Sequence, residues 1–106
     1  MRVLFDQGTP APLRHLLADH EVLTAFELGW STLKNGELLA AAEGHRFDVL
    51  VTTDTRLKYQ QNLGARSIAI VVIATTSWPR IKAAAQGVVV AVDASAPGSY
   101  VEVAIP

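Results

Sequence analysis

The chain has 106 residues, of which half are hydrophobic and 18% are charged, and its formal net charge is −1. This length suits one folded domain over 1–106, and the composition excludes a disordered chain. The near-zero charge argues against a protein that binds nucleic acid through its overall charge, and the lack of cysteine excludes disulfides and thiolate metal sites.

The first half of the chain alternates short apolar runs with segments of helical spacing. Proline at the first position of a helix wastes no hydrogen-bond donor, so Thr9-Pro10 is a good helix start. The expected elements are a strand at 2–5, a helix opened by Thr9 and Pro10, a strand at 21–26, a loop at 29–34, and a helix over 36–43 capped by Asn35.

The second half repeats this alternation and holds the most apolar strand of the chain. The expected elements are a strand at 48–52, a short helix at 55–63, the buried strand at 67–74, a helix opened by Ser77-Trp78-Pro79, and a last strand at 100–105. The segment 86–94 is compatible with a strand or with a continued helix. The helical spacing of Ile81, Ala85, Val88 and Val92 favours a helix there.

Strands that alternate with helices, and that are apolar along most of their length, indicate an α/β domain. We expect three αβα layers around a central, mostly parallel sheet of about five strands. In such sheets, ligands bind beyond the C-terminal ends of the strands. The polar residues at those ends are therefore the candidates for a functional site.

Compartment can be judged from the apolar segments. No apolar run approaches the roughly 20 residues that a membrane-spanning helix needs, and the longest, 68–74, has the length of a strand. The N-terminal segment reaches Asp6 without the apolar stretch of a signal peptide. We therefore expect a cytoplasmic protein without membrane contact.

Two carboxylates are expected at the C-terminal edge of the sheet. Asp6 ends the first strand and Asp54 ends the third, and neighbouring strands lie about 5 Å apart. Glu37, in the first turn of a helix, is a third candidate. Carboxylate oxygens without histidine or cysteine suit Mg²⁺ or Mn²⁺, which can activate water against a phosphodiester.

Each of these acids also has an ordinary structural explanation. Asp54 can cap the helix that begins at Thr55, and Asp6 can close an Asx turn ahead of Thr9. Glu37 lies where the helix dipole favours an acid whatever the function. The metal interpretation gains weight because Asp6 and Asp54 fall at the same sheet edge.

Three motifs, in this order, resemble the PIN-like domains, and the nearest branch is the short bacterial one related to toxin nucleases. The motifs are LFDQGTP at 4–10, NGELLAAAE at 35–43 and VLVTTDTRL at 49–57. The resemblance covers about residues 1–80. PIN domains are metal-dependent ribonucleases with acids at the C-terminal edge of a parallel sheet, and the resemblance implies that Asp6 and Asp54 belong to such a cluster.

The chain departs from this pattern at three points. Relatives often carry Asp-Glu-Asn where this chain reads DQG at 6–8, and an acid at the start of the middle helix where Asn35 stands. Arg56 occupies a position where an acid or amide is frequent. Fewer carboxylates mean weaker Mg²⁺ binding, and Arg56 can instead meet a phosphate.

The resemblance implies an endoribonuclease, with Mg²⁺ or Mn²⁺ as cofactor and single-stranded RNA as substrate. A toxin of this type has an antitoxin protein as partner, and a homodimer is compatible with it. In this interpretation Asp6, Asp54 and Glu37 hold the metal and carry catalysis, Thr52, Thr53 and Asn35 orient the carboxylates, and Arg56, Lys58 and Gln61 contact the RNA backbone.

Two other functions fit the same residues. A non-catalytic PIN-like module that binds a protein is favoured by the reduced number of acids at the site and by an apolar run at 88–92 that looks exposed. A receiver-like phosphoacceptor would use Asp54, with Thr75 and Thr76 after the next strand. This third function lacks the acidic pair after the first strand and a lysine after the last one.

Overall fold

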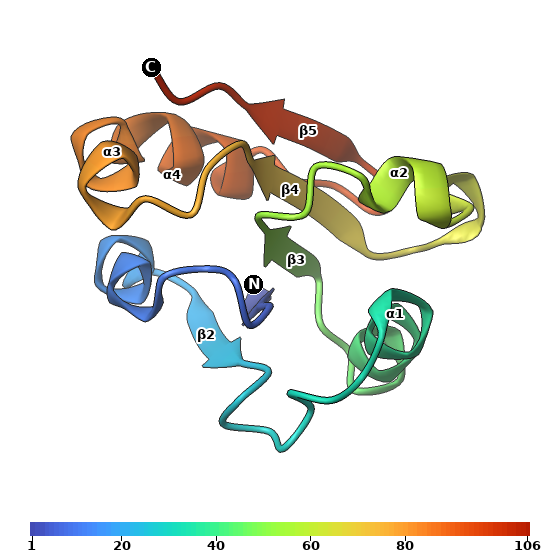
Figure 1. Ribbon diagram of the computed structural model, residues 1–106. Coiled ribbons are helices and arrows are strands. Elements are labelled where there is room, and N and C mark those ends of the chain that lie inside the picture. Colours follow the sequence, from blue (N-terminus) through green and yellow to red (C-terminus); the bar gives the residue numbers. More distant parts are fainter.

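Five parallel strands form the centre of the protein, whose computed structural model describes residues 1–106 (Figure 1). The strands are β1 (Arg2–Phe5), β2 (Glu21–Thr24), β3 (Val49–Thr52), β4 (Ala69–Ile73) and β5 (Tyr100–Val103). They follow the order β2-β1-β3-β4-β5, and every neighbouring pair is parallel. All strands therefore end at one edge, and the α/β prediction is confirmed with a sheet that is parallel throughout.

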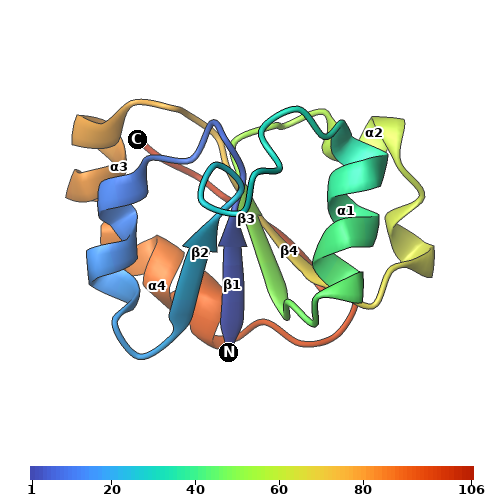
Figure 2. The same cartoon turned by 90° about the horizontal axis from the view of Figure 1, so that it is seen from below.

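Helices cover both faces of this sheet (Figure 2). One face carries η1 (Ala11–Leu17), α3 (Trp78–Ala83) and α4 (Ala85–Asp93). The other carries α1 (Asn35–Gly44) and α2 (Leu57–Gln60), which a short 3₁₀ turn, η2 (Leu63–Ala65), follows. The arrangement matches the predicted three αβα layers. None of these helices is both long and apolar enough to cross a bilayer.

Alternation along the strands divides the core in two. Val3 and Phe5 point to the face of η1, α3 and α4, whereas Leu4 between them points to the face of α1 and α2. The side chains of β3 and β4 are buried along their whole length, because helices cover both faces there. This packing explains why β4 is apolar throughout and why β3 is apolar up to its last residue, Thr52.

Several predicted boundaries shift. The segment after Pro10 is a 3₁₀ helix, and the predicted helix at 55–63 is α-helical only over Leu57–Gln60. Asn35 is the first residue of α1 rather than its cap, since Lys34 precedes the helix in an extended conformation. The helical interpretation of 86–94 is confirmed by α4.

The apolar run at 88–92 is not the exposed surface that the sequence suggested. Val88 and Val92 are fully buried and Ala91 nearly so, because they face the sheet. Only Val90 is largely exposed. The run is therefore a core face of α4, and it no longer supports a docking surface.

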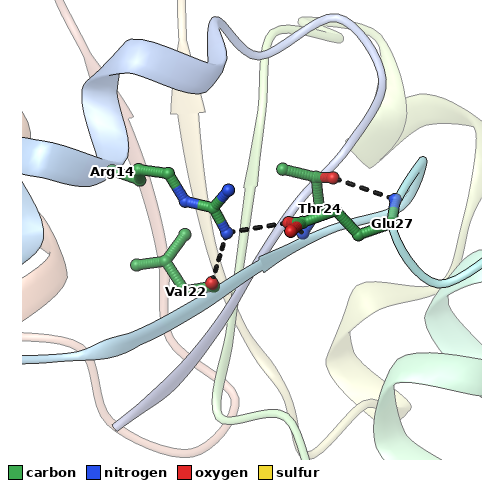
Figure 3. A network of polar contacts seen from close by, with 4 residues as sticks. All are labelled: Arg14, Val22, Thr24 and Glu27. Carbon is green, nitrogen blue, oxygen red and sulfur yellow. Dashed lines mark hydrogen bonds and ion pairs between the residues drawn. The ribbon is translucent and has the colours of Figure 1, made fainter.

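The outer edge of β2 is occupied by side chains of the same chain (Figure 3). An Arg14 guanidinium N–H donates to the carbonyl of Val22 at 2.6 Å and to Glu27 Oε1 at 2.7 Å. The same Glu27 oxygen accepts from the Thr24 backbone N–H at 3.0 Å, and the Thr24 hydroxyl accepts from the Glu27 N–H at 3.1 Å. These contacts tie η1, β2 and the following turn together.

Candidate functional site

One hydroxyl connects the two acids that follow β1 and β3. The Thr52 hydroxyl donates to Asp6 Oδ2, and its oxygen accepts the backbone N–H of Asp54 at 3.0 Å. The Asp6 backbone N–H in turn donates to the carbonyl of Val51 at 3.1 Å, which continues the pairing of β1 with β3. Thr52 is only 2% exposed, so this bridge is fixed within the protein.

Asp6 is held from both sides in a partly buried position. The Thr9 hydroxyl oxygen lies 2.7 Å from Asp6 Oδ1 and 2.9 Å from the carbonyl oxygen of Val51. Burial raises the pKa of the Asp6 carboxyl above its usual value of 3.8, although the hydrogen bonds from Thr52 and Thr9 partly offset that rise. The carboxylate is thus oriented but costly to keep ionised without a cation.

Gly8 lets the loop after β1 pass close to the loop after β3. A Cβ atom at Gly8 would lie 2.6 Å from Thr53 Oγ1 and 3.9 Å from Asp6 Oδ1. Any larger residue would therefore push Thr53 away or lift the loop. Glycine at this position allows the two strand ends to meet.

Asp54 is oriented by the start of α1 and by its own loop. Its Oδ2 accepts from the Asn35 amide at 3.0 Å, and its Oδ1 accepts from the Arg56 backbone N–H at 2.9 Å. The second contact is an Asx turn and corresponds to the local, structural explanation of this acid. The Asn35 amide also donates to Gln60 Oε1 at 2.9 Å, so Asn35 joins α1, α2 and the Asp54 loop.

Glu37 is not joined to the other two acids. Its Oε1 accepts the Lys34 backbone N–H at 3.1 Å and so caps the start of α1. Nowhere in the protein do three His, Asp or Glu side chains gather closely enough to hold a metal ion. The predicted three-carboxylate set is therefore reduced to Asp6 and Asp54.

The side chains predicted to contact RNA differ in whether they already have a partner within the chain. The Arg56 side chain is exposed and has no hydrogen bond or ion pair. Lys58 Nζ lies 2.5 Å from Glu102 Oε1, and this hydrogen bond raises the pKa of Lys58. The amide of Gln61 faces Gly36, where a Cβ would come within 3.1 Å of it. Arg56 alone is available for a phosphate.

Two residues with a role at this site were missed at the sequence level. Thr9 was interpreted only as a helix start, yet its hydroxyl bonds Asp6. The signal for it is the three-residue spacing from Asp6, which is typical of a side chain closing a turn. Gln60 supports Asn35 and carried no such signal.

Comparison with known proteins gives no relative from which to transfer a function. No protein-family model matches the chain, and no significant match was found among curated proteins or solved structures. The resemblance to PIN-like domains therefore stays a prediction.

Proposed function

We propose that the chain is a metal-dependent endoribonuclease of the PIN-like type, in which Asp6 and Asp54 hold one Mg²⁺ or Mn²⁺. The observation that carries this proposal is the Thr52 hydroxyl, which joins the Asp6 carboxylate to the backbone N–H of Asp54 at the C-terminal edge of adjacent parallel strands. This edge is where parallel sheets bind their ligands. An antitoxin partner would follow if the resemblance to toxin nucleases extends to this chain.

The donor set fits a hard divalent cation. Both acids offer carboxylate oxygens, and hydrogen bonds from Thr52 and Asn35 hold them in place, as outer-shell partners do for metal ligands. Mg²⁺ commonly binds through one or two carboxylates and keeps several waters, so two acids suffice for a weak site. When bound, the ion would lower the pKa of a water and offset charge on the phosphodiester.

The surrounding residues have separate tasks in this proposal. Asp6 and Asp54 bind the ion, Thr52 fixes the direction of Asp6, and Asn35 fixes that of Asp54. The free guanidinium of Arg56, two residues beyond Asp54, can pair with a phosphate of the substrate through two parallel hydrogen bonds. The reaction class is hydrolysis of a phosphodiester bond in single-stranded RNA.

Cleavage of a labelled single-stranded RNA with Mn²⁺, Mg²⁺ or EDTA tests this function. We expect wild-type cleavage that depends on the ion, and a loss of roughly a hundredfold or more in Asp6→Asn and Asp54→Asn. Asp19→Asn is the matched control, because Asp19 is an exposed acid that makes no hydrogen bond or ion pair. Full activity in Asp6→Asn, or in EDTA, would contradict the proposal.

A second candidate is a non-catalytic module of the same fold that binds a protein. It is favoured by the fact that both acids already have partners within the chain and that no third acid joins them. Titration calorimetry with Mn²⁺ separates the two functions. Heat of binding that vanishes in Asp6→Asn supports the metal site, whereas no heat and no cleavage support the module.

A further inference from the structure

A cleft of about 510 Å³ lies on the opposite helical layer from α1, between η1 and α3. Figure 2 shows these two helices side by side on one side of the sheet, and Figure 1 places them together as well. The cleft is lined by Pro12, His15, Leu16, Trp78, Lys82 and Ala85. None of these residues belongs to the site around Asp6 and Asp54.

The walls of the cleft combine an aromatic surface with an apolar one. Trp78 is partly buried and rests on the core beneath α3, so its indole is held in place while part of it faces the cleft. Leu16 forms part of the cleft lining and is 44% exposed, so its side chain is accessible to a ligand. A flat apolar group fits such a surface.

The charge of the cleft is one-sided. Lys82 and His15 line it, both are exposed, and neither makes a hydrogen bond or an ion pair. No acid lines the cleft. Its occupant should therefore combine a planar apolar part with an anionic part, a combination that a nucleotide has and that single-stranded nucleic-acid sites recognise through stacking and cationic side chains.

The cleft also lies close to the functional edge of the sheet. η1 begins shortly after β1 ends and α3 begins shortly after β4 ends, so Pro12 and Trp78 are the lining residues nearest the strand ends in sequence. Asp6 itself lies at this edge, between the end of β1 and the start of η1. A single-stranded nucleic acid that crosses the sheet edge at Asp6 would therefore reach the cleft between η1 and α3.

We propose that this cleft binds one nucleotide of single-stranded RNA next to the scissile bond, with the base against Trp78 and Leu16 and its phosphate at Lys82. The His15 imidazole adds a hydrogen bond to the same phosphate. This inference rests on the proposed function and names its substrate contact. It assigns specificity for single strands to the cleft, because a paired base cannot enter it.

Binding can be measured without cleavage. The probe is a short fluorescein-labelled single-stranded DNA in EDTA, which has bases and phosphates but neither the 2′-hydroxyl nor a metal for reaction. We expect Lys82→Gln to weaken binding by roughly threefold to tenfold and to lower the slope of log K against log salt by about 0.7. Leu16→Glu, at an exposed position, is expected to abolish binding through repulsion of the phosphate.

Arg46→Gln is the matched control for charge. Arg46 is exposed, has no side-chain partner and lies before β3, at the opposite end of the sheet. Fluorescence of Trp78 gives a local readout in a Trp30→Phe background, because Trp30 packs against His45 and Phe47 instead. The oligonucleotide is expected to quench Trp78; if that background folds poorly, loss of quenching in Trp78→Phe serves the same purpose.

The outcomes separate this inference from the proposed function. Cleavage that needs Asp6, combined with normal binding by Lys82→Gln and Leu16→Glu, would overturn the proposal that the cleft binds RNA and would leave the proposed nuclease function standing. Binding that needs Lys82 without any cleavage would support nucleotide binding in the cleft and overturn the proposed ribonuclease activity. Quenching of Trp78 fluorescence by a peptide of leucine and glutamate, but not by the oligonucleotide, would overturn the nucleotide-binding role of the cleft in favour of a protein ligand.

Discussion

Asp6 shows how a single residue suited to a functional site can lower the stability of the folded protein. Its carboxyl is partly buried, and two hydroxyl groups hold it at a strand end where the sequence needs only a polar residue to stop the strand. Burial disfavours its ionised form, and a bound cation would relieve that cost. Active sites commonly keep such destabilised groups.

Asp6→Asn is therefore expected to stabilise the protein at pH 7. The amide keeps the bond from Thr52, and the Thr9 hydroxyl can turn to donate to the Val51 carbonyl, 2.9 Å away, while it accepts from the new amide. Because the folded pKa of Asp6 is raised above 3.8, the wild type loses stability as the pH rises from 3.8 through the folded pKa. The gain in melting temperature should be full at pH 7 and vanish below pH 3.8.

Thermal unfolding of Asp6→Asn and of Asp19→Asn across this pH range checks the expectation. Asp19 makes no hydrogen bond, so its substitution should leave the melting temperature unchanged at every pH. An Asp6→Asn variant that is less stable than the wild type at pH 7 would show that the ionised carboxylate holds the strand ends together.

Elements in this fold are joined by acids whose partners lie far along the chain. Glu43, in the last turn of α1, accepts from the Arg66 guanidinium at 2.7 Å and from the backbone N–H and hydroxyl of Ser67 at 2.8 and 3.0 Å. These bonds fix the segment that leads into β4. Burial alone would raise the pKa of Glu43, but these hydrogen bonds outweigh it, so the pKa is lowered.

Glu43→Gln is expected to destabilise the protein by about 1 kcal/mol at pH 7, because partly exposed ion pairs and their hydrogen bonds contribute on that scale. The contribution of Glu43 is complete above its unfolded pKa near 4.5 and is lost as the pH falls through its lower folded pKa. Urea unfolding should thus show wild type and variant converging in acid. Ala40→Gln, on the exposed side of the same helix, is the control.

At this scale the sequence predicted element type better than element boundaries. Apolar runs identified β1, β3 and β4, because helices cover both faces of the sheet there and leave little room for polar residues. The more exposed edge strands β2 and β5 were identified from an alternating pattern. The sequence did not show that Glu37 lies apart from the other two acids, since its carboxylate accepts a nearby backbone N–H instead. The pairing of Lys58 with Glu102 was also hidden, because it depends on β5 lying beside β4.

The whole molecule should respond to metal if the strand-end acids bind it. A ligand that binds only the folded state stabilises it by RT ln(1 + [L]/Kd), about 2.7 kcal/mol at a hundred times Kd. For a domain of about 100 residues, each kcal/mol shifts the melting temperature by roughly 4–8 °C. Mn²⁺ should therefore raise the melting temperature of the wild type and leave that of Asp6→Asn unchanged.

Calcium serves as a control for this shift, since it favours more oxygen ligands than two carboxylates provide. Equal stabilisation of wild type and Asp6→Asn by Mn²⁺ would point to a metal site elsewhere. At the scale of the molecule, the sequence predicted the sheet and located the two acids through the strand-end rule. It did not predict the cleft between η1 and α3, because no motif links Leu16 to Trp78.

The side chains along the outer side of β2 also have a consequence for self-association. A sheet edge with free N–H and carbonyl groups is a template on which another chain can add a strand. Here Arg14 occupies the Val22 carbonyl and Glu27 occupies the Thr24 N–H, so an incoming strand would have to displace both. Growth of an intermolecular sheet, whether an ordered dimer or an aggregate, is therefore directed away from β2 and toward β5, at the other edge.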